Sequence, residues 1–141
     1  DKITYNQMFP HASILFEIRQ ESDYVIWNKK FMDMEDDPTK GGYNIFHTFA
    51  VVYLDLIKDL ENRNKISNQT FLSIKNDLRG FLIDWYYNLC VANTQYRFET
   101  AGEFKNITTY YSVLDYFYIV VVSHYRHLRN CVKKIFRCLI K

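Results

Sequence analysis

The chain has 141 residues, of which 48% are hydrophobic and 24% charged, and its net charge is +2. This length and composition are those of one folded globular domain, and they exclude a disordered chain and a pair of ordinary domains. Because only 4 Gly and 2 Pro interrupt the sequence, we predict a few long elements. The predicted fold is an all-α helical bundle of about four main helices in one domain, residues 1–141.

The first helix is predicted to follow Pro10, a residue that suits the first turn of a helix. Apolar residues then recur near one face, at Leu15, Ile18, Val25 and Met32. The acidic stretch from Asp33 to Gly42 holds Pro38 and a glycine pair, so it predicts a solvated loop.

Two helices with plausible caps follow this loop. Asn44 is a good N-cap for the second helix, which the run from Glu61 to Lys65 closes. Ser67 is a good N-cap for the third helix, and Gly80 inside that helix is tolerable. The apolar residues that carry the helical spacing are Phe46, Phe49, Tyr53, Ile57 and Leu60, then Phe71, Ile74, Leu78, Phe81 or Leu82, Trp85 and Leu89.

The last helix is the longest. Residues 93–106 are predicted to be a connection that has room for a short turn of helix, and such a turn would raise the number of helices to five or six. One long helix is predicted after it, although the β-branched and aromatic start would also suit a strand. The helix is favoured because an apolar spacing of three to four persists over 26 residues. We expect its first half to be buried nearly all round and its later apolar side to pack on the bundle. That side holds Leu114, Phe117, Val121, Tyr125, Leu128, Val132, Ile135 and Leu139.

The end of this helix is basic. Residues 123–141 carry six Lys and Arg and no Asp or Glu, whereas residues 1–122 carry 12 against 16. A basic amphipathic helix suits an anionic partner, which is a nucleic acid, an anionic membrane surface or an acidic protein groove. The residues predicted to bind that partner are Arg126, Arg129, Lys133, Lys134 and Arg137. A plainer interpretation is that these charges only keep the exposed face solvated.

His124 and His127 support an alternative hypothesis, a small nucleic-acid-binding or RNA-cleaving protein. Histidine transfers protons near neutral pH, and Arg126 or Arg129 would hold the phosphate. The two histidines are spaced to share a helix face, but a metal needs further ligands that the sequence does not place. We therefore predict no metal site and no cofactor, and we favour a non-enzymatic protein.

The aromatic content of 18% favours protein binding. It includes 12 tyrosines, more than one core can bury, and exposed Tyr clusters are common in protein interfaces. The leading hypothesis is therefore an interaction module that binds a protein or anionic partner through an aromatic-rich surface and the basic C-terminal helix. Self-association is a further option, since the acidic loop could neutralise the basic end of a neighbouring molecule.

The cysteines and the hydropathy of the sequence indicate where in the cell the protein is expected to be. Cys90, Cys131 and Cys138 are odd in number and lack metal-like spacing, so we expect reduced, buried thiols in an intracellular, cytoplasmic protein. No apolar run reaches about 18 residues. Because the sequence starts at Asp1, we expect a piece of a longer chain, and a missing upstream anchor would make the domain membrane-peripheral.

Overall fold

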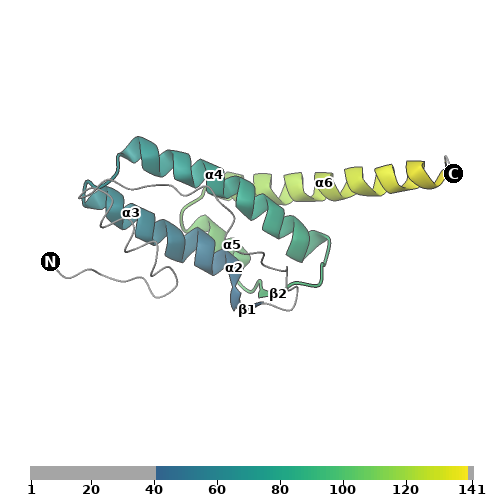
Figure 1. Cartoon of the computed structure of the whole chain (residues 1–141), viewed down its shortest axis with the longest axis horizontal. Coiled ribbons are helices and arrows are strands. Elements are labelled where there is room, and N and C mark those ends of the chain that lie inside the picture. Colours follow the sequence, from purple (N-terminus) through teal and green to yellow (C-terminus); the bar gives the residue numbers. More distant parts are fainter. Residues whose placement is uncertain (1–40, 140–141) are drawn as a thin grey trace, which may run out of the picture.

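Helices dominate the architecture, as the scarcity of chain breakers predicted. The structure is a computed structural model that describes residues 41–139. Over this range an all-α bundle carries only a two-stranded sheet beside its helices, and the longest helix, α6, lies at the C-terminal end (Figure 1). The predicted helix after Pro10 and most of the predicted acidic loop lie outside the described residues.

The second predicted helix is present as three consecutive segments, α2 (Ile45–His47), the π-helical η1 (Thr48–Tyr53) and α3 (Leu54–Asn62). Asn44 caps it as predicted, because its side chain accepts a hydrogen bond from the backbone N–H of His47 at 2.9 Å. The helix ends at the predicted place, where Asn64 takes a positive φ of 58°. Its inward side is mostly apolar, with Thr48 as a buried polar residue, and its best-buried apolar residues are Ile45, Phe46, Ala50, Leu54, Ile57 and Leu60.

The third predicted helix is α4 (Asn68–Tyr86), and π-helical turns, η2 (Tyr87–Val91), continue it. Ser67 caps α4 as predicted, since its hydroxyl accepts from the Thr70 N–H at 3.0 Å. The side of α4 that faces the bundle buries Phe71, Leu78, Leu82, Ile83 and Tyr86.

The chain between η2 and α6 differs in part from the prediction. Part of the expected connection pairs as a strand, β2 (Arg97–Glu99), in parallel with β1 (Gly41–Asn44), whereas the short helix α5 (Glu103–Thr108) is one that the prediction allowed near this place. The last helix is also shorter than expected at its start, because α6 spans Val113–Leu139 and the chain turns at residues 109–112. The reason is a capping interaction at Ser112, described below.

α6 packs on α4 at a buried serine. Ser123 is fully buried, and its hydroxyl lies 2.8 Å from the Ile119 carbonyl of its own helix and 3.2 Å from the Ile83 carbonyl of α4. A small side chain lets two helices approach closely, and the hydroxyl satisfies its donor on a backbone carbonyl. Ile119, one turn earlier and fully buried, completes the contact that α6 makes with the core.

We predict that Ser123→Leu destabilises the fold. The larger side chain would force α6 away from α4, and overpacking of this kind costs about 1–3 kcal/mol. The free energy of unfolding in urea measures the effect. His124→Leu is the matched control, because His124 is exposed on the same helix and should change stability by less than about 0.5 kcal/mol. Equal effects at the two positions would contradict a close crossing at Ser123.

Candidate interaction surface on helix α6

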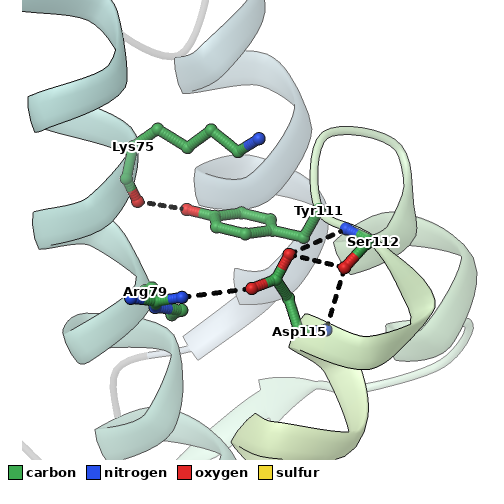
Figure 2. Close-up of polar contacts among 5 residues, drawn as sticks. All are labelled: Lys75, Arg79, Tyr111, Ser112 and Asp115. Carbon is green, nitrogen blue, oxygen red and sulfur yellow. Dashed lines mark hydrogen bonds and ion pairs between the residues drawn. The ribbon is translucent and has the colours of Figure 1, made fainter.

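A small polar network anchors the start of α6 (Figure 2). The Ser112 hydroxyl accepts from the Asp115 N–H at 3.1 Å and donates to the Asp115 carboxylate at 2.7 Å, and the Ser112 N–H donates to the same carboxylate at 3.1 Å. This reciprocal pattern is a capping box, with Asp in the place of the usual Glu. It satisfies the first free N–H groups of the helix, which explains why α6 begins at Val113.

The same carboxylate joins α6 to α4. Arg79 of α4 donates to Asp115 at 3.1 Å, and the Tyr111 hydroxyl donates to the Lys75 carbonyl of α4 at 2.7 Å (Figure 2). The hydrogen bonds from Ser112, followed by the contact with Arg79, hold the pKa of Asp115 below its usual value. Together with Ser123, about two turns further on, these contacts fix how α6 is rotated about its own axis.

This rotation overturns the predicted burial of α6. The side of α6 that faces the bundle holds the buried Ile119 and Ser123 and the half-buried Tyr116, Arg126 and Asn130. The expectation that the long apolar stripe would pack on the bundle is therefore wrong. The first half of the helix is apolar on two sides, and the side that carries the small serine takes the inner position, where α4 comes close.

The apolar stripe instead lies mostly on the solvent side of α6, although Tyr118 near its start still touches α4, because the Arg79 guanidinium lies 5.5 Å from the centre of its ring. We call this stripe the α6 seam, and its described exposed members repeat at alternate spacings of four and three residues. Their exposed fractions run from 41% at Val132 to 80% at Leu114. The members are Leu114, Tyr118, Val121, Tyr125, Leu128, Val132 and Ile135.

Most of the exposed large apolar side chains of the described chain lie on α6. Of 13 large hydrophobic side chains that are exposed among residues 41–139, ten lie on α6. The other three are Tyr43, Leu72 and Phe104, which lie on three different parts of the chain. Scattered exposed hydrophobic residues are normal on a folded protein, whereas one contiguous apolar stripe marks an interaction site.

The other aromatic residues of the described chain mostly contact one another. Trp85 of α4 lies edge-on to Tyr96 and Phe98, at ring-centroid distances of 5.2 and 5.0 Å. Phe98 in turn contacts Tyr43 of β1 at 5.0 Å. These edge-to-face pairs stabilise the small sheet against α4, so they account for part of the aromatic excess without a partner.

The predicted basic site separates into two parts. Arg126 forms an ion pair with Asp84 of α4, and its guanidinium lies 5.8 Å from the ring centre of Tyr87. It therefore serves the packing of α6 on α4. The other basic residues are exposed and form no ion pair with any residue between 41 and 139, and these are Arg129, Lys133, Lys134 and Arg137.

These basic side chains belong to an end of α6 that projects beyond the bundle (Figure 1). Every side chain from Val132 to Cys138 is exposed. Lys133, Lys134 and Arg137 continue the side of the helix that faces the bundle earlier in α6, at Ile119 and Ser123. The inner side thus changes from apolar to basic where its packing partners end, while the seam stays apolar throughout.

The histidines of the alternative catalytic hypothesis have different surroundings. His124 is exposed beside the seam, whereas the His127 ring lies 6.3 Å from that of Tyr87, and its Nε2 is 3.5 Å from the Cys131 sulfur. The His127–Cys131 contact was missed from the sequence, although a spacing of four residues on a helix would have revealed it. Within residues 41–139, no group of three or more His, Cys, Asp or Glu side chains is placed to hold a metal ion.

The cysteines differ from the expectation of buried thiols. All three have free thiols, and Cys90 and Cys138 are exposed while Cys131 is half-buried. They were expected inside because cysteine is among the most frequently buried residue types. Cys131 and Cys138 are instead carried outward by the rotation and the projection of α6.

One hollow of 460 Å³ lies between η1 and α4. Its lining is mostly apolar, and the residues around it are Phe49, Tyr53, Ile74, Asp77, Leu78 and Phe81. It includes none of the predicted basic or histidine residues, so it offers the catalytic hypothesis no substrate site.

Comparison with protein-family models, with curated proteins and with solved structures finds no match to this chain. None of the helices between residues 41 and 139 combines the length and the apolar character needed to cross a bilayer.

We predict that Asp115→Asn costs about 1 kcal/mol of stability at neutral pH, because it weakens the cap of α6 and removes the charge that faces Arg79. A carboxylate with a lowered pKa in the folded state stabilises the fold above its unfolded pKa of about 4, and this contribution disappears as the pH falls through the folded value. The difference between variant and wild type should therefore shrink in acid. Urea unfolding between about pH 7 and pH 2.5 measures it.

Asp77→Asn is the matched control for this prediction, since Asp77 is an exposed carboxylate of α4. It should leave the free energy of unfolding nearly unchanged at every pH. A stability difference for Asp115→Asn that stays constant from neutral pH into acid would show that the charge of Asp115 does not act in the network.

Proposed function

We propose that this chain is a non-enzymatic interaction module that binds a helical protein partner through the α6 seam. The observation that carries the proposal is the concentration of exposed apolar side chains on one helix, ten of the 13 found among residues 41–139. Exposing such a stripe to water is unfavourable, because each large apolar side chain gains about 1.5–3 kcal/mol on burial. A partner that covers the stripe recovers that free energy.

The shape of the stripe favours a helix as the partner. Its residues follow an alternating spacing of four and three, which forms a narrow line along the helix. A narrow line of this period is the contact surface that one helix presents to another, either in a pair or in a groove between helices. Aromatic members such as Tyr118 and Tyr125 add large contact areas, as is common in protein interfaces.

Intramolecular contacts support a binding role over a catalytic one. Arg126 pairs with Asp84, and His127 lies against Tyr87 and Cys131. Both side chains therefore hold α6 to its neighbours. In the catalytic hypothesis these same groups would have to hold a phosphate and transfer protons.

Photo-cross-linking tests the proposed function. The photoreactive residue p-benzoylphenylalanine placed at Leu128, which is 63% exposed in the middle of the seam, should give a covalent adduct with a protein when irradiated in the producing cell. The same replacement at Leu72, a leucine of α4 that is 47% exposed, is the matched control and should give none. Equal labelling at both positions, or no adduct from Leu128, would contradict the proposal.

The projecting basic end of α6 supports a second candidate function, binding of an anionic partner. Arg129, Lys133, Lys134 and Arg137 are exposed and have no ion-pair partner among residues 41–139. They lie away from the seam, apart from Arg129 at its edge, so the two functions do not compete for the same surface. Arg126 was predicted to bind the anionic partner as well, but it is not included in this second candidate because it already pairs with Asp84.

Salt dependence tests this second candidate. If four basic residues contact phosphates of single-stranded RNA, raising the salt from about 50 to 200 mM should weaken binding roughly 50-fold. Fluorescence anisotropy of a labelled RNA measures it, and changing the four residues to Gln should abolish the salt-sensitive part. Binding of equal strength by the Gln variant would contradict this assignment, and anisotropy that never rises at low salt would exclude single-stranded RNA.

A further inference from the structure

We infer that the partner of the α6 seam is a second copy of this chain, bound seam to seam. This inference rests on the proposed function, because it names the helix that the seam binds. Three observations support it, namely the period of the seam, the charges at its edges and its direction relative to the bundle.

The seam has the period of a two-helix contact. Leu114, Val121, Leu128 and Ile135 recur every seven residues, as the d positions of a heptad repeat. The a positions between them are also apolar, and they are Tyr118, Tyr125, Val132 and Leu139. Apolar a and d positions sustained over three to four heptads indicate a coiled coil. Since α6 has 27 residues, a helix about 40 Å long offers all four heptads.

The edges of the seam carry almost no charge, so two copies do not repel each other there. The flanking e and g positions are Asp115, Phe117, Val122, His124, Arg129, Cys131, Phe136 and Cys138. Only Asp115 and Arg129 among them carry a full charge at neutral pH, and Arg79 already pairs with Asp115. In contrast, Arg126, Lys133, Lys134 and Arg137 take the b, c and f positions on the far side of the helix.

This distribution is informative because the helix end is strongly basic. Identical like-charged helices pair only if their charges lie away from the contact, since like charges in an interface are costly. An acidic partner would instead be matched by basic residues beside the seam, where only Arg129 occurs. The charge pattern therefore suits a second copy better than it suits an acidic protein.

The direction of the seam leaves room for the second copy. α6 contacts its own bundle through the buried Ile119 and Ser123, and Val120 and Val122 beside them are partly buried against the core. Val121 and Leu128 lie on the other side of the helix and are exposed, so a second helix can reach them without displacing α4. The projecting end of α6 (Figure 1) would gain a packing partner along its apolar side.

The available area is close to what a stable interface uses. A large aliphatic side chain contributes about 60–120 Å² of apolar surface and an aromatic residue about 150–250 Å². The seven described seam members, together with Phe117 and Phe136 at the edges, thus amount to roughly 700 Å² per copy. Specific protein interfaces bury about 800 Å² per partner.

Sedimentation velocity and light scattering of the purified full chain test the inference. At roughly 1 to 100 µM the mass should rise with concentration toward twice the 17.1 kDa of one chain. Leu128→Lys should raise the dissociation constant about 30-fold or more, because it puts a charge in the centre of the contact. Leu72→Lys, the same substitution at an exposed leucine of α4, should leave the dimer unchanged. Circular dichroism should show that both variants keep the helical fold.

The following outcomes would contradict the inference that the partner is a second copy. A mass of one chain at every concentration would do so, whether the seam then binds residues 1–40, vesicles of anionic phospholipid or another protein. A dimer that survives Leu128→Lys would place self-association on another surface. If cross-linking from Leu128 captures a different protein while the purified chain is monomeric, the proposed function stands and this inference fails. If cross-linking from Leu128 gives no adduct with any protein, the proposed function and this inference both fail.

Discussion

The contact between Ser123 of α6 and the Ile83 carbonyl of α4 is the constraint on which the surface of this protein depends. The first half of α6 is apolar on two sides, so hydrophobicity alone allows two ways of packing it. Close helix approach needs a small residue at the crossing, and the buried hydroxyl needs a hydrogen-bond acceptor. Only the side with Ser123 meets both conditions. The side with the larger residues is then left in water.

The capping network at the start of α6 acts with this contact. Asp115 binds Ser112 within α6 and Arg79 on α4, so one carboxylate both starts the helix and attaches it. Together with Ser123 and the contacts of Arg126 and His127 with Asp84 and Tyr87, this anchor holds the first half of α6 on its neighbours, and the helix extends beyond them. The result is a helix with three surfaces, one packed, one apolar and exposed, and one basic at its end.

The sequence was sufficient for features that depend on local chemistry. Asn44 and Ser67 were recognised as caps because a short polar side chain before an apolar run satisfies free backbone N–H groups. The helical class followed from periodicity and scarce breakers. Features that depend on long-range pairing were missed, such as β2, which exists because it pairs with β1 about 55 residues earlier. Likewise, the apolar period of α6 predicted a stripe correctly, but not which way it faces, since that is decided by residues of α4.

The projecting end of α6 is the part of the helix whose local order a partner would change most. Residues Val132 to Cys138 have exposed side chains on every side, and a helical segment this short is marginally stable in water by itself. Its backbone amides should therefore exchange with deuterium through local fraying, far faster than those beside Ser123. A partner that covered the end would add its binding free energy to that local stability. If that partner is a second copy, the protein concentration would set, by mass action, how long this helix remains folded to its last turn.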